Sequence, residues 1–139
     1  MDVAFLIDRT PSLSVGDLEL EKGFVAELVG ALNVSPDATH VGIIMFDKEG
    51  EVIADFKDES LYSKEALYEL IERIPNFRRK PTRTDIALMT ANNWLFTPEG
   101  GDRPKFPNAL IILTDGKTNP VSKPSFEIIP LLKVSLRND

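Results

Sequence analysis

The fold is decided by the first stretch of the chain, Asp2-Val3-Ala4-Phe5-Leu6-Ile7-Asp8-Arg9-Thr10-Pro11-Ser12. Its five consecutive apolar residues, 3–7, are too few for a helix and are typical of a strand buried on both faces. An acid and two hydroxyls follow at alternate positions: Asp8, Thr10 and Ser12. Ligands of open α/β sheets bind beyond the carboxyl ends of the strands. The stretch therefore predicts a buried first strand with a binding site at its carboxyl end.

The rest of the chain alternates between helical and strand patterns. Apolar spacing predicts helices at 15–32, 60–74 and 85–96, and a short helix at 126–136 interrupted by Pro130. Strands are expected at 40–46, at 51–56 as the returning arm of a hairpin, and at 108–114. This pattern indicates an α/β fold with a Rossmann-like open sheet and helices on both faces. We expect a mainly parallel sheet with one antiparallel edge hairpin strand, in the order hairpin, second, first, fourth.

Composition narrows the class of protein. A chain of 139 residues is expected to form a single domain, 1–139. The net charge of −6 and the shortness of the basic runs argue against nucleic-acid binding. No apolar run approaches the roughly 20 residues of a membrane span, so we expect no membrane insertion. The absence of cysteine excludes disulfides and thiolate ligands.

A second buried strand also ends in an acid, Asp115. If the sheet order reverses beside the first strand, Asp8 and Asp115 meet at the switch point. The loop that carries Thr82 precedes a helix and could reach the same edge. Together with Thr10 and Ser12 these residues offer two carboxylates and three hydroxyls. Such a donor set suits Mg²⁺, or alternatively Mn²⁺ or Ca²⁺, rather than zinc.

Three motifs resemble the von Willebrand factor A domain and its metal-ion-dependent adhesion site. They are Asp-x-Thr-x-Ser at 8–12, Thr-x-Thr-x-x-Ala-Leu at 82–88 and Leu-Thr-Asp-Gly at 113–116, in the family's order and structural context. The resemblance covers essentially the whole chain. It implies a non-catalytic domain that binds proteins, and by resemblance only an extracellular, matrix or adhesion setting.

The resemblance also assigns roles. It implies that Thr10 and Ser12 bind the metal directly, that Asp8 and Asp115 act through water, and that Thr82 joins in the ligand-bound state. A Glu or Asp carboxylate of a protein partner, possibly a matrix protein, would complete the coordination. The rim that faces this partner would be formed by Arg9, Pro11, Arg83 and Gly116.

The sequence departs from the family pattern in two places. Arg9, Thr10 and Pro11 replace the commoner Gly, Ser and Gly; Thr10 keeps the hydroxyl, whereas Arg9 and Pro11 crowd the rim. The chain also stops before the family's last strand and helix, so we expect a domain that is incomplete at its C-terminus. The outer edge of strand 108–114 would then be unpaired and could support self-association.

The same residues leave other functions open. A Mg²⁺-dependent phosphoryl-transfer enzyme could use Asp8, but position 10 is not a second Asp and no phosphate-binding glycine loop is present. A serine hydrolase would need a base beside Ser12, whereas the sole histidine, His40, is expected at the far end of its strand. A metal-independent structural scaffold is a further alternative.

Three features lie outside this site. Asn33-Val34-Ser35 is a glycosylation sequon, which Pro36 disfavours and which matters only in a secreted protein. The run Arg78-Arg79-Lys80 is typical of a solvated loop, or of a basic patch for an acidic matrix component. Trp94 and Phe96 are expected to pack in the core or at the helix end, and not to form a ligand platform.

Overall fold

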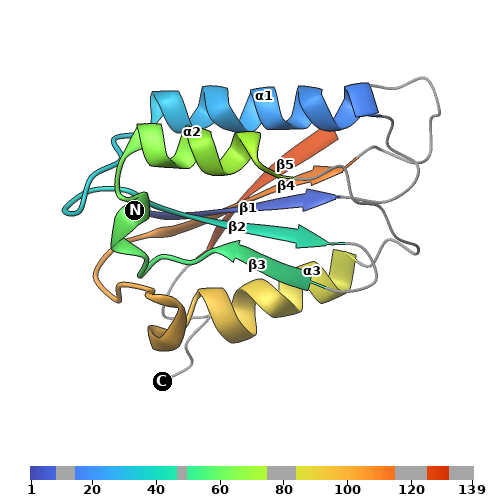
Figure 1. The fold of residues 1–139 in the computed structure, drawn as a ribbon. Helices are drawn as coiled ribbons and strands as arrows, with labels where there is room; N and C mark the ends of the chain where they lie inside the picture. Colours follow the sequence, from blue (N-terminus) through green and yellow to red (C-terminus); the bar gives the residue numbers. More distant parts are fainter. Residues whose placement is uncertain (9–14, 47–49, 75–83, 115–124, 132–139) are drawn as a thin grey trace.

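The computed structural model describes residues 1–8, 15–46, 50–74, 84–114 and 125–131 (Figure 1). Its strands are β1 (Asp2–Asp8), β2 (His40–Phe46), β3 (Gly50–Ala54), β4 (Asn108–Thr114) and β5 (Ser125–Leu131). Its helices are α1 (Val15–Ala31), α2 (Lys64–Glu72) and α3 (Thr84–Thr90). Three short helical segments, η1 (Glu59–Leu61), η2 (Ala91–Leu95) and η3 (Pro98–Gly100), complete the described chain.

The described strands form one sheet in the order β3-β2-β1-β4-β5. Strand β1 is central and pairs in parallel with both β2 and β4. The hairpin strand β3 returns antiparallel to β2, as expected. The Rossmann-like fold class and the order hairpin, second, first, fourth are therefore confirmed.

One element was predicted wrongly. Residues 125–131 form β5, a strand antiparallel to β4, and not a helix. Pro130 was read as a helix interruption, but a proline is also tolerated in an edge strand, where one N–H is not needed for pairing. The outer edge of β4 is consequently paired along its whole length, so the expected self-association through that edge has lost its basis. The sheet has an antiparallel strand at each edge instead of at one.

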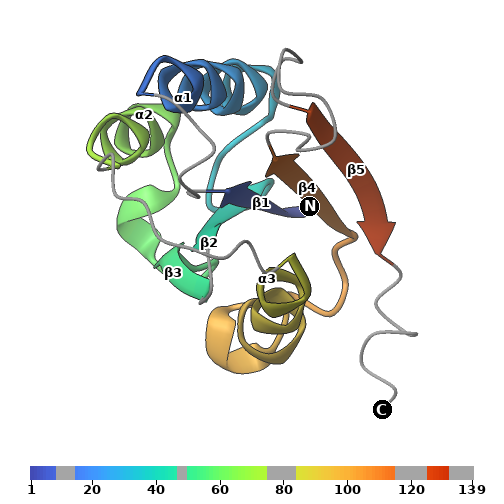
Figure 2. The same cartoon turned by 90° about the vertical axis from the view of Figure 1, so that its right-hand side faces the viewer.

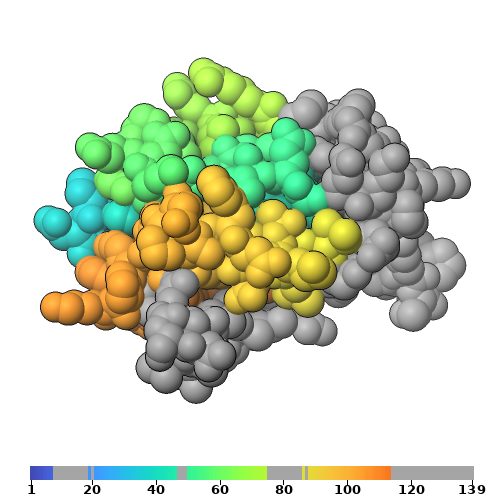
Figure 3. All heavy atoms as spheres, turned by 90° about the horizontal axis from the view of Figure 1, so that it is seen from below, coloured from blue at the N-terminus to red at the C-terminus, as the bar shows by residue number. Residues whose placement is uncertain are grey.

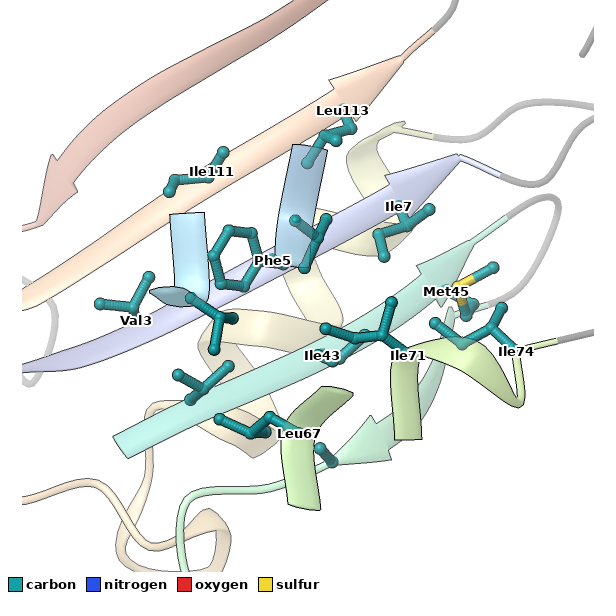
Figure 4. Close-up of a cluster of buried hydrophobic side chains, with 14 residues drawn as sticks. Val3, Phe5, Ile7, Ile43, Met45, Leu67, Ile71, Ile74, Ile111 and Leu113 are labelled. Atoms are coloured by element: carbon teal, nitrogen blue, oxygen red, sulfur yellow. The ribbon is translucent and has the colours of Figure 1, made fainter. Parts of the chain in front are cut away.

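Helices cover both faces of the sheet (Figure 2). Odd-numbered residues of β1 pack beneath α1 and α2, in a cluster that includes Phe5, Ile43 and Leu67 (Figure 4). Even-numbered residues of β1 pack on the other face, in a second cluster with Phe56 and Leu95. The strict alternation follows from the two-residue repeat of a strand, and explains why the apolar run 3–7 has no polar position.

Helices α1 and α2 run antiparallel on their face of the sheet (Figure 1). Neither has a basic residue in its own last turn. Instead, Lys64 at the start of α2 donates to the carbonyl of Gly30 near the end of α1, with 2.8 Å between nitrogen and oxygen. Lys22 of α1 donates to the carbonyl of Glu72 at the end of α2, at 3.4 Å. Each helix therefore supplies the cation that the carboxyl end of the other attracts.

The other face is covered by α3, η2 and the segment that leads to β4 (Figure 3). η2 is a π-helical turn closed by a bond from the Phe96 amide to the Ala91 carbonyl, at 2.8 Å. Phe96 is buried in the core, whereas Trp94 is 42% exposed and lies in η2, at the end of the helical segment. Within the described residues, no helix has both the length and the apolar character that a membrane span requires.

Candidate metal site at the carboxyl edge

The carboxyl ends of three strands meet at one edge of the sheet. Asp8, the last residue of β1, pairs with Phe46, the last residue of β2. On the other side of β1, Ile7 pairs with Leu113 of β4. Because neighbouring strands lie about 4.8 Å apart, the main chains of Asp8 and Thr114 are adjacent. Asp115, which follows Thr114 in the sequence, is thus joined to the strand end that lies beside Asp8.

Two helices begin at the same edge (Figure 1). α1 begins at Val15, three residues after Ser12 in the sequence. α3 begins at Thr84, two residues after Thr82. The described elements therefore attach the three segments that carry the hydroxyl and acid motifs to one end of the sheet, as an oxygen-ligand site at the switch point requires.

The apolar core continues up to this edge. Ile7, Met45 and Phe46 are at most 1% exposed, and Leu113 is 2% exposed. Water is therefore excluded from beneath the strand ends, and electrostatic interactions next to such a floor are stronger than in bulk solvent. The strand ends also have little freedom to move apart, because they are held in register.

The side chains of the predicted site lie beyond what the structure describes. Of the predicted ligands, only the main chain of Asp8 is described. Thr10, Ser12, Thr82 and Asp115 lie outside the described residues, as do the rim residues Arg9, Pro11, Arg83 and Gly116. Among the described residues themselves, no three His, Cys, Asp or Glu side chains are grouped as metal ligands. The ligand set therefore remains a prediction, whose donor chemistry fits a hard divalent cation.

The opposite, amino-terminal edge carries a polar cluster that the sequence analysis missed. Asp2 is fully buried, and its carboxylate accepts bonds from the side chain of Arg103 at 2.7 and 2.9 Å and from the Arg103 amide at 2.9 Å. The same guanidinium donates to the carbonyls of Ala38 and Met1, at 2.6 and 3.2 Å. Arg103 thus ties the start of β1 to the turn that precedes β2. The only sequence signal was an acid at the start of an otherwise apolar strand.

His40 also belongs to this amino-terminal edge. Its ring stacks on Tyr62, with centroids 3.9 Å apart, and Nε2 lies 2.9 Å from the carbonyl of Pro36. Burial lowers the pKa of His40, and the nearby Arg103 lowers it further, whereas burial raises the pKa of Tyr62. The expected position of His40, at the start of its strand, is confirmed. Because β2 spans seven residues, His40 lies about 20 Å from the carboxyl edge, too far to serve as a base at that edge.

An open α/β sheet whose strand order reverses beside its first strand is the class that the fold defines. A family model of the von Willebrand factor type A domain matches residues 2–133. The chain belongs to this family, and the resemblance seen in its motifs is confirmed.

The chain is similar to a von Willebrand factor A domain-containing protein and to a collagen chain, both of them longer proteins. The chain is 34% identical over 118 residues to von Willebrand factor A domain-containing protein 2 of Xenopus laevis, covering 85% of the chain and 14% of that protein. It is 32% identical over 116 residues to the mouse collagen alpha-5(VI) chain, covering 84% of the chain and 4% of the relative. The chain therefore spans only a small part of the length of these relatives.

Solved structures support the fold. Proximal thread matrix protein 1 from the mussel byssus superposes with a TM-score of 0.77 at 21% identity, covering 85% of this chain and 31% of that one. A further structure of that protein has a zinc-occupied MIDAS motif and superposes with a TM-score of 0.68 at 17% identity, covering 73% of this chain and 27% of the other.

Proposed function

We propose that this domain binds a protein ligand through a divalent cation held at the carboxyl edge of the sheet. The observation that carries the proposal is the pairing of Ile7 with Leu113, which sets the strand ends before Asp8 and Asp115 side by side. The family relationship and the matrix relatives support a protein-binding role. The setting that we propose is extracellular.

The residues of the ligand set divide into three roles. Thr10 and Ser12 hold the cation by their hydroxyl oxygens, and Asp8 and Asp115 supply the negative charge and orient bound water. Thr82 completes the set when a ligand is present. A bound divalent cation supplies an open position that accepts a carboxylate oxygen. We therefore propose that the partner presents a Glu or Asp side chain to this edge, against the rim of Arg9, Pro11, Arg83 and Gly116.

Magnesium is the cation that we propose, because all donors are hydroxyl or carboxylate oxygens and Mg²⁺ prefers such ligands. Manganese and calcium share this preference. The zinc-occupied motif of the mussel protein indicates that a site of this family can also take a softer ion, so metal identity is tested directly below.

The distribution of charge favours an acidic partner. Four segments, 9–14, 47–49, 75–83 and 115–124, join described residues at the carboxyl edge. They contain eight of the 16 Lys and Arg residues and three of the 22 Asp and Glu residues, a net charge of +5. The rest of the chain has eight basic and 19 acidic residues, a net charge of −11. An acidic ligand is therefore attracted to this edge and repelled elsewhere.

Thermal unfolding with and without metal tests the proposal. A cation that binds only the folded state stabilises it by about 2.7 kcal/mol at a hundredfold excess over its dissociation constant. The midpoint of the wild type should rise from EDTA to Mg²⁺, whereas that of Asp115→Ala should not. Repeating the titration with Mn²⁺, Ca²⁺ and Zn²⁺ identifies the preferred ion.

The matched control is Asp37→Ala, which removes an exposed acid from the turn at the opposite edge. It should keep the full metal response. A wild type that does not respond to any of these ions would leave a metal-independent scaffold as the function. Hydrolysis of an aryl phosphate that is lost in Asp8→Ala would instead indicate phosphoryl transfer.

A further inference from the structure

The chain contains one N-glycosylation sequon, Asn33-Val34-Ser35, in the connection between α1 and β2. Asn33 is exposed, and within the described residues its side chain makes no hydrogen bond. Val34 packs against the first core cluster, and Ser35 is half-buried. The asparagine is therefore presented outward from a segment that is anchored by its neighbour.

The main chain around the sequon is held by several bonds. The amide of Thr39 donates to the carbonyl of Asn33 at 2.9 Å, and the amide of Ala38 donates to the carbonyl of Ser35 at 3.2 Å. Arg103 holds the carbonyl of Ala38, as described above. None of these bonds uses the Asn33 amide group. A substituent on its Nδ2 atom would consequently break none of the hydrogen bonds described around the sequon.

The sequon lies at the end of the molecule opposite the candidate metal site. Asn33 follows the C-terminal end of α1, whereas the metal edge lies at the start of that helix (Figure 1). The 17 residues of α1 span about 25 Å at 1.5 Å per residue. A bulky, solvated group on Asn33 would cover the amino-terminal edge and leave the carboxyl edge open to a protein ligand.

We propose that Asn33 carries an N-linked oligosaccharide in the secreted protein, an inference that rests on the extracellular setting of the proposed function. The donor would be a lipid-linked oligosaccharide pyrophosphate. The Nδ2 atom of Asn33 forms a bond to the anomeric carbon of the first sugar and loses one proton. The bond from that carbon to the pyrophosphate oxygen breaks, and the lipid pyrophosphate leaves with the electron pair.

Pro36 sets how many chains are modified. A proline restricts the residue before it, here Ser35, whose hydroxyl completes the sequon. In the fold, Pro36 is an exposed residue of the turn, and its carbonyl accepts from His40. We expect partial occupancy in the wild type, and higher occupancy in Pro36→Ala, which keeps that carbonyl.

The test is to secrete the full chain from eukaryotic cells behind a cleavable signal peptide and to measure intact mass before and after peptide N-glycosidase treatment. The wild type should contain a fraction that loses mass on treatment, with Asn33 converted to Asp in the peptide map. This fraction should disappear in Asn33→Gln and in Ser35→Ala. Both variants should keep the wild-type unfolding midpoint, because neither side chain makes a described hydrogen bond.

Secreted wild type without a glycan would overturn the inference, and so would a glycan found only in Pro36→Ala, since Pro36 would then block the site. The metal site is tested by a separate measurement. Asp115→Ala should carry the same glycan as the wild type, and Asn33→Gln should show the same midpoint shift with Mg²⁺. A glycan without a metal response refutes only the proposed function, whereas a metal response without a glycan refutes only this inference.

Discussion

At the scale of single residues, the protonation of His40 gives the clearest dependence of folding stability on pH. Its Nε2 atom donates to the carbonyl of Pro36, so Nδ1 is the deprotonated nitrogen, and among the described residues the buried Nδ1 has no hydrogen-bond partner. A second proton would therefore enter a site with no acceptor. Arg103 and the N-terminal amine oppose the added charge, Asp2 favours it, and the stacked ring of Tyr62 keeps water away.

The lowered pKa of His40 predicts a loss of stability in acid. The unfolded chain has a histidine pKa of about 6.5 and binds the proton first as pH falls. Stability should therefore decrease from about pH 6.5 down to the lower pKa of the folded state, by at most about 1.4 kcal/mol per pH unit. Urea unfolding of wild type and His40→Gln across this range measures the effect. Parallel curves of stability against pH for the two proteins would contradict this prediction.

The Asp2–Arg103 pair predicts a large mutational effect. Arg103→Met should destabilise the fold by about 3–5 kcal/mol, because it removes the guanidinium that pairs with a fully buried carboxylate. Adding Asp2→Asn should recover part of this loss, since a neutral amide needs no counter-ion. The control is Arg73→Met, whose ion pair with Glu69 is exposed and 4.0 Å long, and which should change stability by less than about 1 kcal/mol. Equal losses in both variants, measured by urea unfolding, would disprove the role of the buried pair.

At the scale of elements, the sequence predicted best the strands that are buried on both faces of the sheet. The runs in β1, β2 and β4 are almost entirely apolar, and their strand assignments are confirmed. Helix ends were less exact: the expected helix 60–74 is divided into η1 and α2, because Ser63 caps α2 through a bond from the Ala66 amide at 3.2 Å. The helix prediction for the segment 125–131 failed because a short apolar run with one proline fits an edge strand as well as a broken helix.

The pairing of β5 with β4 predicts how the chain responds to shortening. A chain that ends at Pro124 would expose the outer edge of β4, whose centre is the apolar run 109–113. Such an edge pairs readily with another chain, so this protein should self-associate. A chain that ends at Leu131 keeps the pairing and should behave like the full chain. Size-exclusion chromatography with light scattering compares them, and a monomeric chain ending at Pro124 would show that β5 does not protect the edge.

At the scale of the whole molecule, the topology explains why the candidate site could be located from the sequence while its geometry could not. Parallel strands place their carboxyl ends at one edge whatever the loops do, so Asp8 and Asp115 could be assigned to one region. The positions of Thr10, Ser12 and Thr82 depend on loops whose conformation no periodic pattern encodes. The amino-terminal cluster was missed for a related reason: Asp2 and Arg103 are far apart in sequence, and only the fold brings them together.

The separation of charge predicts that basic residues of the carboxyl edge speed the arrival of an acidic ligand. The probe is a Glu-containing acidic peptide, with its Gln counterpart as a neutral reference. Replacing Arg78 and Arg79 by Gln should slow association severalfold at about 0.01 M salt, where charges act over about 30 Å, and much less at 0.15 M. The matched control replaces Lys57 and Lys105, two exposed lysines outside the four segments at that edge, and should change the rate little.

Metal and steering charge should act on different rates. Asp115→Ala should remove the Mg²⁺-dependent part of peptide binding at both salt concentrations. Loss of the contact between the peptide carboxylate and the cation should act chiefly by raising the dissociation rate of the peptide. The two arginines should instead alter association, and only at low salt. Surface plasmon resonance with Mg²⁺ or EDTA separates the two effects. If both pairs of substitutions slowed association equally, the positive edge would have no steering role, and partner selection would depend on the metal and its rim alone.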